Sequence, residues 1–122
     1  MSKKILVVDD SVTVRQQVSS VLEQAGYAVA EAEDGRVGAE TIESSEDIAM
    51  VICDVNMPRM NGLEMVGRVK KGGARAELPI VMLTTEGNPQ LISQAKELGA
   101  KGWIVKPFKA DHLLAAVQKL TA

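Results

Sequence analysis

Two kinds of segment alternate along the 122-residue chain. Short apolar runs, typical of buried strands, are each followed by a segment whose apolar residues recur at helical spacing. The runs that predict strands are residues 5–8, 27–32, 48–54, 79–83 and 103–105. Three of them are almost wholly apolar, as expected of central strands in a parallel sheet covered on both faces. The run from Tyr27 is less apolar, and we expect it at an edge of the sheet.

Capping and turn residues predict where the helices begin and end. The first helix should open near Ser11 and stop at Gly26, and the fourth should run from Pro89 to Gly99. The other three are expected after residue 35, from 62 to 72–73, and over 113–120, while residues 70–77 are typical of a flexible loop. A β-α unit repeated five times predicts one α/β domain over residues 1–122, with helices on both faces of a five-stranded parallel sheet.

Composition and charge exclude several classes of function. The net charge is −2 and the 14 Lys and Arg residues are dispersed, so there is no basic footprint for nucleic acid. The longest apolar stretch, residues 48–53, is far too short to span a membrane, and the N-terminus lacks a signal-peptide pattern. We therefore expect a cytoplasmic protein. The single cysteine, Cys53, excludes an internal disulfide and is expected to fill the core.

Polar residues stand directly after four of the apolar runs. Parallel strands bring their carboxyl ends to one edge, where open α/β sheets bind ligands, so we expect these residues to converge. Adjacent carboxylates raise each other's cost of ionising unless a cation lies between them, and Mg²⁺ readily accepts carboxylate oxygens. Taken alone, the aspartates and the threonine are each equally well explained as a helix cap or loop residue. Together the set suits a phosphoryl group and a divalent metal: Asp9, Asp10, Asp54, Thr84 and Lys106.

Asp54 is the candidate nucleophile of this set. A carboxylate beside Mg²⁺ can attack phosphorus and form an acyl phosphate, and Asn56 is placed to offer its backbone carbonyl to the same ion. Lys106 lies at the inner edge of the predicted sheet, where an ammonium group is unfavourable unless it faces an anion. The sequence leaves open whether the Lys106–Pro107 bond is cis or trans.

Four blocks of the sequence resemble the signature of the receiver domain of two-component response regulators. They are ILVVDDS at residues 5–11, DVNMPRMNG at 54–62, LPIVMLT at 78–84 and VKPF at 105–108, and they cover essentially the whole chain in the family's order. Because nothing follows the fifth predicted helix, the chain resembles a stand-alone receiver of the chemotaxis (CheY-like) type. The resemblance implies a doubly wound, flavodoxin-like (βα)5 fold and a phosphorylation-activated switch, not a conventional enzyme.

The resemblance also implies a role for each residue of the site. Asp54 would accept a phosphoryl group from the phosphohistidine of a histidine kinase. Asp9 and Asp10 would hold Mg²⁺, together with Asp54 and the backbone carbonyl of Asn56. Mg²⁺ would be the only cofactor. Phosphoryl transfer and autodephosphorylation would be the only reactions.

Further positions are implied in switching and in the phosphoryl lifetime. Thr84 would hydrogen-bond the phosphoryl group, and Lys106 would pair with it. Trp103 stands where the family usually has a Tyr or Phe that rotates inward when Thr84 moves, so the larger indole is a departure from the pattern. Asn56 and Glu86 fall where such proteins tune dephosphorylation.

The implied partners are a chemotaxis-type histidine kinase, an output protein such as a flagellar motor component, and a phosphatase. We expect the output surface over the fourth helix, fifth strand and fifth helix, including Trp103, Lys109 and a solvent-facing His112. A phosphorelay intermediate remains an alternative within the family. A haloacid-dehalogenase-type phosphatase would carry its nucleophile after the first strand and its acid pair late, the reverse of the order here. A constitutive binding module would not need the intact site.

Overall fold

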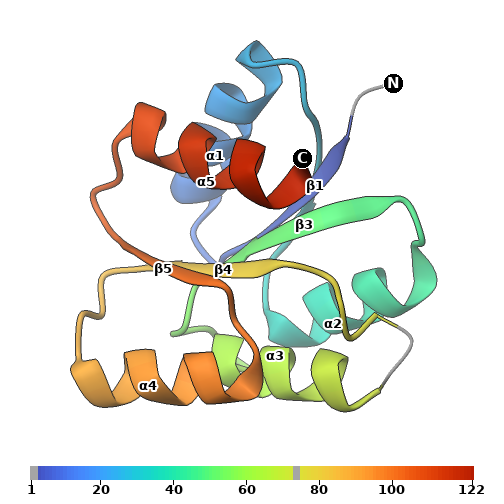
Figure 1. Ribbon diagram of the computed structural model, residues 1–122, viewed down its shortest axis with the longest axis vertical. Helices are drawn as coiled ribbons and strands as arrows, with labels where there is room; N and C mark the ends of the chain where they lie inside the picture. Colours follow the sequence, from blue (N-terminus) through green and yellow to red (C-terminus); the bar gives the residue numbers. More distant parts are fainter. Residues whose placement is uncertain (1–2, 73–74) are drawn as a thin grey trace.

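The computed structural model describes residues 3–72 and 75–122, and strand and helix alternate five times along them (Figure 1). The strands are β1 (Lys4–Val8), β2 (Ala28–Ala32), β3 (Ile48–Cys53), β4 (Ile80–Thr84) and β5 (Gly102–Val105). The helices are α1 (Val12–Gln24), α2 (Gly35–Ser44), α3 (Gly62–Lys71), α4 (Pro89–Leu98) and α5 (Ala110–Thr121).

All strand pairings are parallel, and the strand order is β2-β1-β3-β4-β5. Helices α1 and α5 cover one face of the sheet, and α2, α3 and α4 cover the other (Figure 1). This is the doubly wound, flavodoxin-like arrangement expected from the sequence. The less apolar second strand lies at an edge, as predicted, because only one of its sides pairs with another strand.

Local sequence explains most of the helix ends. The Ser11 side chain accepts a hydrogen bond from the first turn of α1, and Gly99 ends α4 in the left-handed conformation with φ 108°. In α3 the side chain of Asn61 accepts from the Glu64 amide while the Glu64 side chain accepts from the Asn61 amide, which forms a capping box. Helix α3 continues to Lys71, so the start of the expected loop over 70–77 is helical; residues 73–74 lie outside the described part.

Alternate residues of the central strands supply two hydrophobic clusters, one on each face of the sheet. From β1, Ile5 and Val7 pack with residues of α1 and α5, whereas Leu6 and Val8 pack with residues of α2 and α3. Burial on both faces accounts for the continuous apolar runs in the sequence. Cys53 is fully buried in the second cluster, and burial raises the pKa of its thiol well above its usual value, as suits a core residue.

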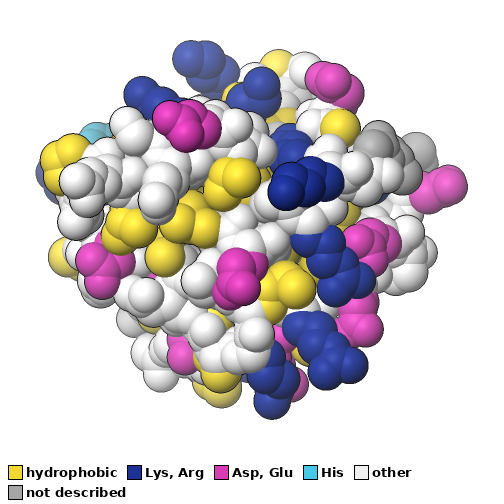
Figure 2. All heavy atoms as spheres, turned by 90° about the horizontal axis from the view of Figure 1, so that it is seen from below, with side chains coloured by type: hydrophobic (Ala, Val, Ile, Leu, Met, Phe, Trp, Pro, Cys, Tyr) yellow, Lys and Arg dark blue, Asp and Glu magenta, His cyan; other side chains and the backbone are white. Residues whose placement is uncertain are grey.

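The surface over α2, α3 and α4 carries acidic and basic side chains interspersed with apolar ones (Figure 2). This face therefore does not present a field of a single sign. Within residues 3–72 and 75–122, no helix has both the length and the apolar character needed to cross a bilayer.

Candidate functional site

The carboxyl ends of β1 and β3 lie side by side at the site. Val8 pairs with Cys53 across these strands, and the Asp54 amide donates to the Val8 carbonyl at 3.0 Å. The next residues, Asp9 and Asp54, are therefore neighbours, with 2% and 8% of their surfaces exposed. Asp10 is exposed, and one carboxylate oxygen from each of these three aspartates lies within 4.8 Å of the others.

Lys106 reaches this acid cluster from the end of β5. Its Nζ lies 2.8 Å from Asp9 Oδ2 and 3.2 Å from Asp54 Oδ2. Its backbone amide donates to the Thr84 carbonyl at 2.8 Å, and the Lys106–Pro107 bond is cis. Burial alone would lower the pKa of Lys106, but the contacts with both aspartates outweigh it and raise the pKa, so the ammonium group stays charged.

The second oxygen of each buried carboxylate accepts a backbone hydrogen bond. Asp9 Oδ1 accepts from the Ser11 amide at 2.9 Å, and Asp54 Oδ1 accepts from the Val55 amide at 2.7 Å. Burial raises the pKa of Asp9, against the lowering effect of Lys106 and of the Ser11 amide. The cluster holds three carboxylates, and Lys106 pairs with two of them, so a divalent cation would balance the remaining negative charge. Hard oxygen ligands in this number suit Mg²⁺.

Thr84 ends β4 and is completely buried. Its hydroxyl accepts a hydrogen bond from the Glu86 amide at 3.3 Å. In this state the Thr84 side chain is thus held by the loop that follows its own strand. A move toward a phosphoryl group would require that bond to break.

Glu86 contacts both Trp103, expected to take part in switching, and Asn56, expected to tune dephosphorylation. The Trp103 indole Nε1 donates to the Glu86 carbonyl oxygen at 2.8 Å, and the Asn56 amide Nδ2 donates to Glu86 Oε1 at 3.0 Å. Trp103 is half-buried and packs on the cluster shared with α2 and α3. The sequence analysis assigned Asn56 and Glu86 to tuning and Trp103 to switching, but it did not predict that Glu86 contacts both of the other residues.

Two arginines next to the site were missed by the sequence analysis. Arg15 of α1 donates from Nη1 to the Asp9 carbonyl at 2.6 Å and from Nε to Glu31 Oε1 at 3.1 Å. Arg59, in the loop after β3, pairs with the buried Asp34. Neither contact has a signature in the sequence, because each joins segments whose approach depends on loop geometry.

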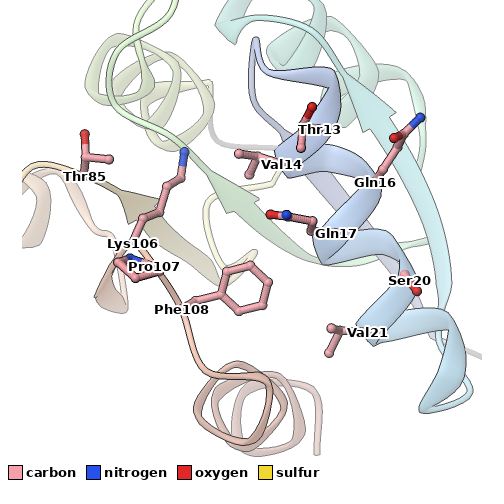
Figure 3. A pocket seen from close by; sticks show the side chains of 10 residues that line it. All are labelled: Thr13, Val14, Gln16, Gln17, Ser20, Val21, Thr85, Lys106, Pro107 and Phe108. Carbon is pink, nitrogen blue, oxygen red and sulfur yellow. The ribbon is translucent and has the colours of Figure 1, made fainter.

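An open groove of about 840 Å³ runs along α1 beside the acid cluster. In Figure 3 the Phe108 ring points toward α1, whereas the Lys106 side chain extends in a different direction from the same segment. Of the expected site residues, only Lys106 lines this groove. Asp9, Asp10 and Asp54 do not line this groove.

Comparison with known proteins identifies the class of this fold and site. Residues 5–118 match the response regulator receiver domain family. The chain is 42% identical to the chemotaxis protein CheY1 of Helicobacter pylori over 111 residues, which cover 90% of each chain. It is also 42% identical over 111 residues to a chemotaxis protein CheY homologue of Campylobacter jejuni, and that match covers 90% of this chain and 85% of the relative.

Solved structures agree with this result. The chemotaxis protein CheY4 of Vibrio cholerae superposes with a TM-score of 0.91 at 42% identity, over 98% of this chain and 99% of that one. A response regulator of Chloroflexus aurantiacus gives a TM-score of 0.92 at 31% identity, over 99% and 98%. The chain belongs to the response regulator receiver domain family. Within that family it is a CheY-like receiver, a phosphorylation-activated signalling switch of two-component systems.

Proposed function

We propose that Asp54 accepts a phosphoryl group from the phosphohistidine of a histidine kinase and that the modified protein changes its binding to an output protein in chemotaxis. One observation carries the proposal. The Asp54 carboxylate lies between the Val55 amide and the Lys106 ammonium group, with the carboxylates of Asp9 and Asp10 beside it. A nucleophile, a cation and two further acidic ligands at one strand edge suit phosphoryl transfer.

The protein's part in the transfer is positioning and charge neutralisation. The Val55 amide fixes one Asp54 oxygen, so the other is presented to phosphorus. An oxygen–phosphorus bond forms as the phosphorus–nitrogen bond of phosphohistidine breaks, and the electron pair returns to the imidazole. Lys106 then pairs with the transferred group. Mg²⁺, bound by Asp9, Asp10 and Asp54, would neutralise charge on the phosphoryl oxygens.

The Asn56 backbone carbonyl is the fourth proposed protein ligand of Mg²⁺. The Asn56 side chain donates from Nδ2 to Glu86 Oε1, and the proposed metal ligand is the backbone carbonyl oxygen of the same residue. By the family resemblance, Asn56 and Glu86 occupy positions that tune dephosphorylation, so we assign that role to this pair.

Switching begins, in this proposal, when the phosphoryl group competes with the Glu86 amide for the Thr84 hydroxyl. Moving Thr84 alters the loop that accepts the hydrogen bond from Trp103. The result is a shift between two conformations of β5 and its neighbours. The output protein would bind over α4, β5 and α5, where Lys109 and His112 are exposed.

The chemotaxis assignment rests on the relatives, which are named chemotaxis proteins. A kinase of that pathway, a motor component as output and a phosphatase would then be the partners. A phosphorelay intermediate would use the same site and pass the phosphoryl group to another histidine protein. Membership of the receiver family argues against a function as a conventional phosphatase.

The decisive experiment is labelling with acetyl phosphate and Mg²⁺, read by intact mass. We expect one phosphoryl group per chain, lost in alkali as acyl phosphates are. Asp54→Asn should take up none, whereas the control Asp47→Asn, at an exposed aspartate paired with Lys4, should be labelled like the wild type. Label on Ser, Thr or His, or repeated turnover of a phosphate monoester, would contradict the proposal.

A further inference from the structure

The loop between β3 and α3, residues 55–61, connects the phosphoacceptor to the next helix and contains Asn56. Its first residue, Val55, is buried, and the Gly62 amide donates to the Val55 carbonyl at 2.8 Å. These contacts fix the two ends of the loop. Its middle, at Arg59 and Met60, is held by contacts with a different loop.

Arg59 has a backbone conformation that side chains disfavour. Its φ is 65°, and among the described residues it is the only non-glycine residue with positive φ. For a residue with a Cβ atom this left-handed conformation costs about 1–2 kcal/mol. Such a conformation persists only where surrounding contacts determine it, and it concentrates at functional sites.

The contact that holds Arg59 is an ion pair with Asp34, the residue just before α2. Arg59 Nε and Nη2 lie 2.7 and 2.6 Å from Asp34 Oδ2. The other oxygen, Oδ1, accepts from the Val37 amide at 2.9 Å and caps the helix. Asp34 is 0% exposed, and each of its carboxylate oxygens accepts a hydrogen bond. Hydrogen bonds that join charged groups, such as Arg59 and Asp34, are stronger than those between neutral groups.

A backbone contact reinforces the ion pair one residue further along. The Gly35 amide donates to the Met60 carbonyl at 3.0 Å. A Cβ atom at Gly35 would lie 2.9 Å from the Met60 carbonyl carbon and closer still to its oxygen, so only glycine permits this approach. The loop before α2 and the loop after Asp54 are therefore joined by the Arg59–Asp34 ion pair, by a longer ion pair at 3.5 Å between Arg59 and the exposed Glu33, and by one backbone hydrogen bond.

We propose that Arg59 is a positioning residue for the metal: by pairing with the buried Asp34 it fixes the β3–α3 loop so that the Asn56 carbonyl is presented to the acid cluster. The inference rests on the proposed function, because it assumes that Mg²⁺ binds there. It explains why a charged side chain occupies a position whose backbone favours glycine. The guanidinium group supplies a restraint that glycine lacks.

The test compares Mg²⁺ affinity in variants, measured by titration calorimetry on the unphosphorylated protein. Arg59→Gly is the informative change, because it relieves the strained backbone while removing the ion pairs that Arg59 makes with Asp34 and Glu33. We expect its dissociation constant for Mg²⁺ to rise about tenfold, the lower end for residues that support metal ligands. Asp34→Asn, which keeps an oxygen for the helix cap, should weaken Mg²⁺ binding similarly, and the double variant should add little, because both changes break one contact.

Arg68→Gly is the matched control. Arg68 also links α3 to α2, through Glu43 at 2.7 Å, but both side chains are exposed and neither contacts the loop. Its removal should leave Mg²⁺ affinity within twofold of the wild type. A second readout, hydrogen exchange at the Gly35 amide, should become faster in Arg59→Gly and not in Arg68→Gly.

The outcomes separate this inference from the proposed function. The positioning role is overturned if Arg59→Gly and Asp34→Asn both bind Mg²⁺ as tightly as the wild type while Asp10→Ala abolishes binding. The proposed function would then stand, and Arg59 would have only a stabilising role. Failure of the wild type to bind Mg²⁺ overturns both. Weaker binding in both variants with normal binding in Arg68→Gly supports the positioning role.

Discussion

The indole of Trp103 donates a hydrogen bond to the backbone carbonyl of Glu86 at 2.8 Å. This bond ties the edge strand β5 to the loop that follows Thr84. Since the Glu86 amide is at the same time the donor to the Thr84 hydroxyl, a single residue connects the buried hydroxyl with the half-buried aromatic ring. A change at Thr84 therefore reaches Trp103 through one residue.

Trp103 fluorescence should report the activated state. Trp103 is the only tryptophan, so its emission comes from one position. On adding beryllofluoride and Mg²⁺ we expect a change in emission wavelength or acrylamide quenching, because Thr84 releases the Glu86 amide and the indole changes its surroundings. The change should disappear in Asp54→Asn and diminish in Thr84→Ala. An unchanged spectrum with beryllofluoride binding verified independently would show that Trp103 has only a structural role.

The arrangement of strands and the meeting of Asp9, Asp54 and Lys106 follow from sequence periodicity, because parallel strands place their ends at one edge whatever the loops do. Contacts between loops do not follow from periodicity. The pairing of Arg59 with Asp34 depends on how two loops cross, and a buried aspartate before a helix has the same sequence signature as an ordinary cap. Periodicity likewise does not predict the cis Lys106–Pro107 bond, since both isomers fit the pattern.

Mg²⁺ should stabilise the folded protein through the acid cluster. At ten times the dissociation constant, binding to the folded state alone adds about 1.4 kcal/mol to the free energy of unfolding. For a domain of this size the melting temperature should rise by about 3–6 °C. Asp10→Ala should abolish the rise, and Asp47→Asn should retain it. An equal rise in Asp10→Ala would remove Asp10 from the metal site.

The stability of the fold should depend on pH through Asp34. Burial alone would raise the pKa of Asp34, but the hydrogen bonds from the Val37 amide and Arg59 outweigh it and lower the pKa below its ordinary 3.8. As the pH falls, the unfolded state therefore takes up a proton at Asp34 before the folded state does. The Asp34 carboxylate contributes fully to the free energy of unfolding well above pH 3.8, and this contribution is lost as the pH falls below about 3.8.

Urea denaturation of the wild type and Asp34→Asn at pH 7 and at pH 3 measures this dependence. The difference in unfolding free energy between the two proteins should be large at pH 7 and smaller at pH 3. Asp111→Asn, at an exposed residue in the first turn of α5, is the control. A difference that stays constant between the two pH values would show that the Asp34 carboxylate does not carry the effect.

Two glycines of α3 should respond oppositely to alanine. At Gly62, directly after the β3–α3 loop, a Cβ atom would overlap the Asp54 carbonyl oxygen and lie 2.8 Å from Met82 Cε. The backbone there cannot retreat without moving Asp54, so Gly62→Ala should lower the free energy of unfolding by about 1–3 kcal/mol and slow labelling by acetyl phosphate. At Gly67 the nearest atom, Leu98 Cδ2, is 3.7 Å away, and Gly67→Ala should stabilise the helix by about 0.5–1 kcal/mol with labelling unchanged.

Urea denaturation and labelling rates of the two variants, measured side by side, check both signs. Loss of stability in Gly67→Ala, or normal labelling in Gly62→Ala, would mean that the close approach of α3 to the Asp54 carbonyl does not hold the acceptor in place.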